Sequence, residues 1–114
     1  MLTVSQLSKR YSLSRTTILY YEKVGLLEPA SRSESGYRYY APKQLRQLEQ
    51  ILAYRSFGLS IKEIGKLLVE DDSDQQQRSL IQQFTTLESE IVALRNQQQS
   101  ILALLEQSKI KRQQ

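Results

Sequence analysis

The sequence predicts a mostly α-helical protein in which a small domain with a short hairpin precedes one long helix. Three observations predict this class: short helical patterns with capping residues in the first 70 residues, a tyrosine-rich segment that favours strand, and a heptad pattern after residue 75. We divide the 114 residues into a domain over 1–70, an acidic linker over 71–74, a long helix over 75–109 and a frayed tail over 110–114.

Two short helices are predicted at the N-terminus. Thr3 and Gln6 have the spacing of a capping box, which predicts a helix over 4–10. After a short turn, Ser14 is a suitable N-cap for a second helix over 15–23, and Gly25 suits the left-handed residue that ends a helix. Two short helices joined by a tight turn indicate a helix-turn-helix.

The segment EPASRSESGYRYYA, residues 28–41, does not continue the helical pattern of the residues before it. Pro29 interrupts the helical pattern, and the tyrosines near its end favour a strand. We predict a hairpin with strands over 26–28 and 37–40 and its bend near Gly36. The tyrosines could simply cover a small core. The arginine between them and the hydroxyl-rich tip also suit a wing that touches a nucleic-acid backbone.

Two further helices follow the hairpin. Pro42 is a favoured first helical residue, and the helix it begins is expected to end near Gly58. Ser60 and Glu63 form a second capping box, which predicts a fourth helix. The last predicted helix, over 75–109, has Asp74 as its expected cap.

The last helix carries an uninterrupted heptad seam. Intervals of four and three residues separate its members, which are Leu80, Phe84, Leu87, Ile91, Leu94, Gln98, Ile101 and Leu105. Each apolar member contributes ~1.5–3 kcal/mol if fully buried, so the seam favours a partner helix. The front domain could instead cover part of it. Gln98, the polar member, either fixes the helix register or marks local access to solvent.

Charge and composition limit the classes of function that the sequence suggests. Residues 1–70 hold 11 Lys and Arg against 6 Asp and Glu, whereas residues 71–114 hold 5 against 6. The basic front suits a polyanion, although a merely soluble basic surface is equally consistent with the charge. Cysteine and histidine are absent, so we expect no disulfide, no metal site, no cofactor and no enzyme activity. There is no membrane-length apolar run and no secretion-signal layout, so we expect a cytoplasmic protein.

Three motifs together resemble the MerR family of bacterial transcription regulators. They are SRTTILYYEKVGLL at 14–27, SGYRYY at 35–40 and RSFGLSIKEI at 55–64, and the resemblance covers residues 2–69. It implies a winged helix-turn-helix domain and a homodimer held by antiparallel packing of the long helices. It also implies that the second helix of each copy enters a major groove, in successive half-sites of a palindromic promoter. The family bends and untwists the promoter spacer so that RNA polymerase can engage both of its elements.

The second helix supplies the first predicted DNA contacts. Arg15, Thr16 and Thr17 lie in its first turn, where phosphate and base edges can be reached, although Thr17 could instead be a local cap. Tyr20 and Tyr21 cannot share one face. By resemblance, we assign Tyr20 to the DNA side and Tyr21 to the core.

The wing supplies the next contacts. By resemblance, Tyr37 and Arg38 touch the DNA backbone, and the charged fork of Arg38 suits phosphate geometry. A salt bridge between Arg38 and Glu28 or Glu34 is the alternative. Glu22 is expected to be a structural ion-pair partner rather than a base reader.

Three more residues complete the predicted site. Lys43 and Arg55 are secondary phosphate candidates, and Arg55 could instead hold the wing to the helices. Leu19 stands where the family has arginine, so it either touches a thymine methyl group or packs. Such departures alter the operator sequence more than the mode of binding.

The sequence leaves open which effector, if any, the protein senses and whether it activates or represses transcription. The protein could bind DNA without an effector, bind a small ligand at the dimer interface, or lack a sensor that a longer chain would carry. A repressor, an architectural DNA binder and a coiled-coil adaptor for an acidic protein are the alternative functions.

Overall fold

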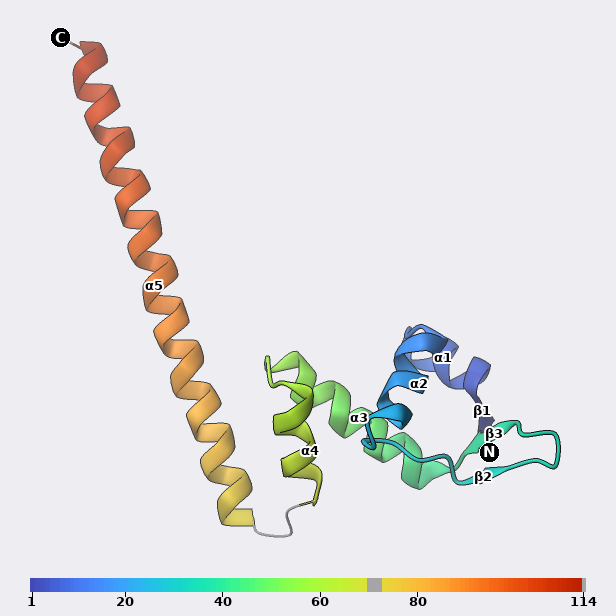
Figure 1. The fold of residues 1–114 in the computed structure, drawn as a ribbon. Helices are drawn as coiled ribbons and strands as arrows, with labels where there is room; N and C mark the ends of the chain where they lie inside the picture. The colour runs from blue at the N-terminus through green and yellow to red at the C-terminus, as the bar shows by residue number, and fades with distance from the viewer. Residues whose placement is uncertain (70–72, 114) are drawn as a thin grey trace. The chain divides into compact units, whose positions relative to one another are not determined.

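The computed structural model describes residues 1–69 and 73–113, with side chains described as far as residue 109. The chain divides into two compact units, residues 1–71 and residues 72–114, and each is described here by itself. Figure 1 shows the elements in order, which are β1 (Leu2–Thr3), α1 (Val4–Tyr11), α2 (Arg15–Lys23), β2 (Ser31–Arg32), β3 (Arg38–Tyr40), α3 (Pro42–Ser56), α4 (Ile61–Val69) and α5 (Ser73–Gln113).

The predicted caps of the first two helices are confirmed. Thr3 Oγ1 accepts from the Gln6 amide at 3.2 Å, and Gln6 Oε1 accepts from the Thr3 amide at 2.9 Å, which closes the capping box of α1. Ser14 Oγ accepts from the Thr17 amide at 3.0 Å at the start of α2. Gly25 follows α2 with a φ of +84°, a conformation that glycine adopts without strain.

The sheet differs from the predicted hairpin. β3 is the central strand of three, and it pairs antiparallel with β1 on one side and β2 on the other. The predicted strand over 26–28 is wrong. Leu27 is a buried core residue whose amide donates to the Tyr21 carbonyl at 3.3 Å, so this segment belongs to the turn that follows α2. Pairing with β3 begins only beyond Pro29, where the Ala30 amide donates to the Tyr39 carbonyl at 2.8 Å.

The core of the first unit lies where its helices meet the sheet. Its buried apolar side chains come from every helix of the unit, from β3 and from the segments after α2 and α3, and they are Val4, Leu7, Ile18, Tyr21, Leu27, Tyr40, Leu48, Ile51, Leu59, Ile64 and Leu67. Tyr11 ties α1 to α3 through its hydroxyl, which donates to Glu49 Oε1 at 2.7 Å. The capping box of Ser60 and Glu63 at the start of α4 is confirmed.

The second unit is the single helix α5, which is longer than the predicted 75–109. Ser73 and Asp74 belong to its first turn, so Asp74 is not a preceding cap, and the backbone of residues 110–113 is helical. Residues 71 and 72 of the predicted linker and the terminal residue 114 lie outside the described residues. The physical reason for the extra length is that neither glycine nor proline interrupts residues 73–113.

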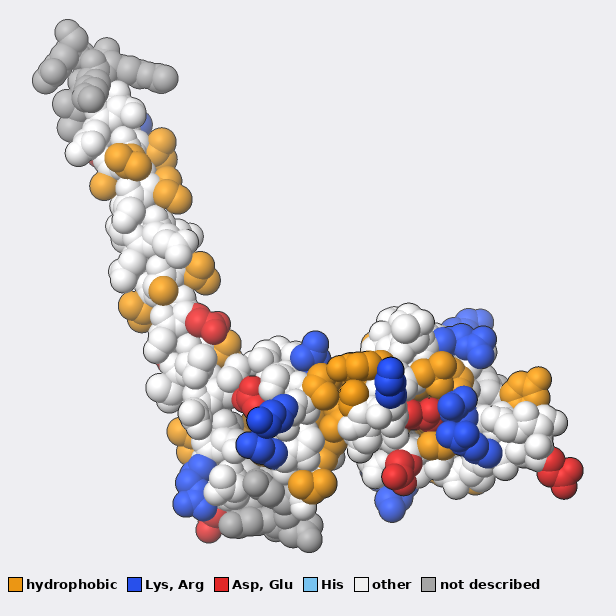
Figure 2. Space-filling model, in the orientation of Figure 1, with side chains coloured by type: hydrophobic (Ala, Val, Ile, Leu, Met, Phe, Trp, Pro, Cys, Tyr) orange, Lys and Arg blue, Asp and Glu red, His pale blue; other side chains and the backbone are white. Residues whose placement is uncertain are grey.

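The seam of α5 is open in a single chain. Leu80 is half-buried, and the seven members from Phe84 to Leu105 are exposed. Apolar side chains recur along this helix in the space-filling view (Figure 2). No described helix combines the length and the apolar character that crossing a bilayer requires.

Candidate nucleic-acid interface

The first turn of α2 presents polar side chains to solvent. Arg15 and Thr16 are exposed, whereas Thr17 is half-buried. The Thr17 hydroxyl lies 2.8 Å from the Ser14 hydroxyl, within the local cap that the sequence offered as its alternative role. Leu19, one turn further along, is half-buried, and its side chain is therefore only partly available to a ligand.

The two adjacent tyrosines of α2 have opposite environments. Tyr21 is 6% exposed and belongs to the core, whereas Tyr20 is 45% exposed. Their ring centroids lie 6.3 Å apart with a tilt of 50° between the planes. The predicted inward orientation of Tyr21 is confirmed, and Tyr20 is the ring that a ligand could reach.

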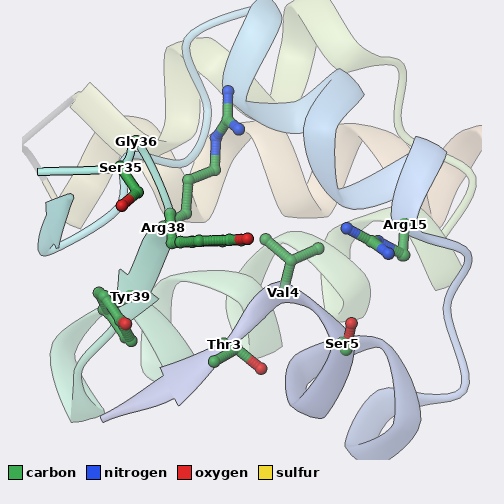
Figure 3. Close-up of a pocket in the computed structure, with 9 residues that line it drawn as sticks. Thr3, Val4, Ser5, Arg15, Ser35, Gly36, Arg38 and Tyr39 are labelled. Carbon is green, nitrogen blue, oxygen red and sulfur yellow. The ribbon is translucent and has the colours of Figure 1, made fainter. Parts of the chain in front are cut away.

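A hollow of about 740 Å³ lies between the N-terminal segment, the start of α2 and the wing. Figure 3 shows Arg15 and Arg38 on opposite sides of it, with Thr3 and Ser5 along another edge. Its nine lining residues include these two arginines and no acidic residue. Five of them carry a hydroxyl group, namely Thr3, Ser5, Ser35, Tyr37 and Tyr39. Cations and hydroxyl donors around one open cavity suit an anion such as a phosphate group.

The wing tip, between β2 and β3, forms a defined turn. The Gly36 amide donates to the Ser33 carbonyl at 2.9 Å, and the Ser33 amide donates to the Tyr37 carbonyl at 2.8 Å. Gly36 has a φ of +85°, which confirms the predicted bend. Tyr37 is 69% exposed beside this turn, so its ring and hydroxyl are open to a partner.

Arg38 pairs with Glu22 of α2. Its Nε donates to Glu22 Oε2 at 2.6 Å, so the partner is Glu22 rather than Glu28 or Glu34, which were the alternative. The structural ion-pair role predicted for Glu22 is confirmed. The side chain of Glu22 is 9% exposed and that of Arg38 is 32% exposed, so the arginine keeps solvent-facing atoms while the carboxylate is largely enclosed.

Tyr40 completes this cluster. Its hydroxyl donates to Glu22 Oε1 at 2.7 Å, and its ring is buried. Burial and then the hydrogen bond to the Glu22 carboxylate raise the pKa of the Tyr40 phenol well above its ordinary value. Tyr40 therefore stays a neutral donor throughout the physiological pH range.

Lys43 and Arg55 lie outside the hollow. Lys43 is exposed and lines a second cavity, of about 420 Å³, with residues from α3, α4 and the segment after α2. Arg55 donates through Nη1 to the Leu59 carbonyl at 3.2 Å, so it ties the turn between α3 and α4. The suggestion that Arg55 holds the wing is wrong, because its bonded partner is local.

Sequence reasoning missed the contribution of the N-terminal segment. Thr3 and Ser5 line the hollow because β1 pairs with β3, with Leu2 opposite Tyr40 and Thr3 opposite Tyr39. A two-residue strand has no periodicity to detect, and its partner lies more than 35 residues away in the sequence. No local signal could have identified it.

No metal centre is present in the part of the chain that the structure describes. There, no group of three or more His, Cys, Asp or Glu side chains is placed to hold a metal ion.

Two family models match the chain. One, described as "MerR HTH family regulatory protein", matches residues 2–70, and the other, "MerR, DNA binding", matches residues 45–107. This is a family of transcriptional regulators, which agrees with the prediction that the chain is not an enzyme.

Individual relatives support the same assignment. The chain is 32% identical over 111 residues to the HTH-type transcriptional regulator CueR of Salmonella typhimurium, a match that covers 92% of this chain and 80% of CueR. It is 39% identical over 79 residues to the transcriptional regulator BrlR of Pseudomonas aeruginosa, covering 68% of this chain and 29% of BrlR. Two uncharacterised HTH-type regulators are matched over 51% and 50% of their lengths. The chain thus spans about half or less of these last three relatives.

Solved structures share the architecture. The N-terminal part of MtaN, the Bacillus subtilis multidrug transporter activator, superposes with a TM-score of 0.83 at 27% identity, covering 92% of this chain and 98% of that one. EcmrR, in the EcmrR–DNA complex of EcmrR-RPo, gives a TM-score of 0.82 at 28% identity, covering 97% of this chain and 41% of that one. These matches confirm the predicted fold class, a helical winged helix-turn-helix domain with a long C-terminal helix. The chain therefore belongs to the MerR family of HTH transcriptional regulators.

Proposed function

We propose that two copies of this chain form a homodimer that binds a palindromic promoter through α2 and the wing. The observation that carries the proposal is the hollow between them, which Arg15 and Arg38 flank and no acidic side chain lines. A DNA backbone offers the phosphate oxygens that such a cavity would accept. The dimer would bind nucleoid DNA in the cytoplasm.

Each predicted contact has a place in this proposal. Arg15, Thr16 and Tyr20 are exposed on α2, where they could enter the major groove. Tyr37 and Arg38 would rest on the backbone from the wing. Four further contacts are proposed with less weight. Thr17 and Leu19 are half-buried, and Thr17 also bonds locally to Ser14. Arg55 bonds locally to Leu59, and Lys43 lines the second cavity instead of the hollow.

The exposed seam of α5 supports the homodimer. An apolar stripe that repeats every 3.5 residues needs a second helix to cover it, and a second copy supplies an identical stripe. The eight proposed dimer contacts are the seam residues from Leu80 to Leu105.

Residues beside the seam favour the antiparallel arrangement. In an antiparallel pair in which Leu80 faces Leu105 of the second copy, Glu88 lies beside Arg95 of that copy. The same register sets Ile81, which is exposed, beside Leu102, which is also exposed. Flanking side chains set helix orientation in coiled coils, and here the apolar pair is the one that discriminates, because a parallel pair would also set a glutamate, Glu90, beside Arg95 but would set Gln97 beside Leu102.

One solved relative supports a role at the promoter. EcmrR was solved with DNA in EcmrR-RPo, an RNA polymerase open complex, which supports RNA polymerase as a partner at the bound promoter. We propose that the dimer bends and untwists the spacer, a deformation that costs ~1–6 kcal/mol for a short site and is recovered through backbone contacts.

Selection of duplexes from a random pool tests the binding proposal. An inverted repeat should be enriched, and binding to it should weaken steeply as salt rises. Arg15→Ala should make the slope of log affinity against log salt shallower by about one, since one phosphate contact is lost. Arg78→Ala, which removes the same charge from α5, is the control and should leave the slope unchanged. Enrichment of no sequence, or equal slopes for both variants, would contradict the proposed interface.

The output is tested separately by transcription in vitro from the selected site. Activation that depends on spacer length supports the bending mechanism. Repression at every spacer length would favour a repressor or an architectural role instead.

A further inference from the structure

Glu22 joins α2 to the wing. It lies in the last turn of α2, and both of its carboxylate oxygens are bonded to β3. Oε2 accepts from Arg38 Nε at 2.6 Å, and Oε1 accepts from the Tyr40 hydroxyl at 2.7 Å. Two charge-assisted hydrogen bonds from one side chain to two residues of the same strand fix both distance and orientation.

The surroundings of Glu22 exclude a direct reading role. Both oxygens are occupied by donors, and the side chain is 9% exposed, so neither oxygen is available to accept from a base. The ring of Tyr40 is buried in the core, so Tyr40 and Glu22 together form a rigid support for Arg38.

The geometry leaves the outer edge of Arg38 for another partner. Its Nε faces Glu22, and a guanidinium group carries four further N–H donors on its two terminal nitrogens. With 32% of the side chain exposed, Arg38 can bind a phosphate through these atoms while Nε stays on Glu22. An arginine that is free to rotate loses rotamer entropy when it binds a phosphate, whereas Arg38 has already lost part of that entropy because Glu22 holds it.

We infer that Glu22 is a positioning residue, which sets the wing against α2 and presents Arg38 to the DNA backbone. This inference rests on the proposed DNA-binding function. A different role, simple neutralisation of Arg38, predicts effects of opposite sign, so the two can be separated.

The test compares substitutions at Glu22 by DNA-binding titration on the selected duplex. Glu22→Ala removes both acceptors and should weaken binding about tenfold, equivalent to about 1.4 kcal/mol. Glu22→Asp keeps the charge but withdraws the carboxylate by one methylene, so it should also weaken binding. Glu22→Gln should recover most of the affinity, because its amide oxygen can accept from Arg38 Nε and its amide N–H can donate to the Tyr40 oxygen.

Glu28 offers the matched control. It is exposed and lies in the segment after α2, so Glu28→Ala and Glu28→Gln make the same charge changes away from the cluster. Both should bind as the unchanged protein does or slightly more tightly. If Glu22→Ala binds as tightly as Glu28→Ala, or if Glu22→Asp binds normally, Glu22 does not position Arg38.

A coupling measurement adds a readout that general loss of stability would not move. Arg38→Ala should cost much less affinity in the Glu22→Ala background than in the unchanged protein, because Arg38 is then no longer held in place. Equal costs in both backgrounds would overturn the inference. Thermal melts should show that each variant remains folded at the assay temperature.

A measurement without DNA separates this inference from the proposed function. Amide hydrogen exchange at Ser33 and Tyr37, whose amides are bonded within the wing tip, should become faster in Glu22→Ala, while exchange at the core residue Leu48 stays unchanged. Unchanged exchange in the wing would contradict the support role. Failure of the unchanged protein to bind any duplex would instead reject the proposed function.

Discussion

Leu94 gives the sharpest test of the proposed homodimer. It lies in the middle of the seam and is 59% exposed in a single chain, so most of its side chain is available for burial by a partner. Fully burying a leucine contributes ~1.5–3 kcal/mol, and 59% of that is about 1–2 kcal/mol per chain. Because both copies change, Leu94→Ala should destabilise the dimer by about 2–4 kcal/mol, which raises its dissociation constant about 30- to 700-fold.

Sedimentation equilibrium over a range of protein concentrations measures this constant. Val92→Ala is the matched control, because Val92 is 54% exposed but lies two residues before Leu94, roughly on the opposite side of the helix. It should leave dimerisation unchanged. Equal dissociation constants for the two variants would refute the assigned seam, and a monomeric parent protein would refute the dimer itself.

Three further predictions concern the first unit. Leu48→Ala, at a fully buried position, should lower the free energy of unfolding by ~2–5 kcal/mol in urea titrations, and a loss under about 1 kcal/mol would contradict its place in the core. Ser14→Ala removes the acceptor of the Thr17 amide and should cost ~0.5–2 kcal/mol in thermal melts, with Ser14→Asp restoring it; equal melts for Ala and Asp would argue against the cap. Because the pKa of Tyr40 is raised in the folded state above an unfolded value of 10.0, its contribution to stability is complete below that pH and is lost as pH rises above it. Tyr40→Phe should therefore flatten the fall in unfolding free energy above about pH 10, and parallel profiles for the two proteins would count against the buried phenol.

The helices could be predicted because their signals are local. Caps such as Thr3 with Gln6 and Ser60 with Glu63 connect residues three apart, so the same hydrogen bonds are available before any tertiary structure forms. Helical geometry also requires adjacent residues to point in different directions, which separated Tyr20 from Tyr21 without reference to the fold.

The sheet could not be predicted in the same way. Leu27 is apolar and follows a helix, so its sequence context fits either a strand or a core loop, and only the position of α2 relative to the core decides between them. The strand β2 consists of two exposed polar residues, Ser31 and Arg32, which carry no strand pattern.

The sequence by itself determined the helical order, the heptad seam of α5 and the family motifs, because each depends on spacing along the chain. Only the tertiary structure decided that Arg38 pairs with Glu22, that Tyr40 shares this carboxylate, and that the N-terminal strand helps to line the hollow. These contacts join residues 16 to 38 positions apart, and their partners are chosen by the packing of α2 and β3 around the common core. Several acidic residues could have reached Arg38 in an unfolded chain, and folding enclosed Glu22 beside it.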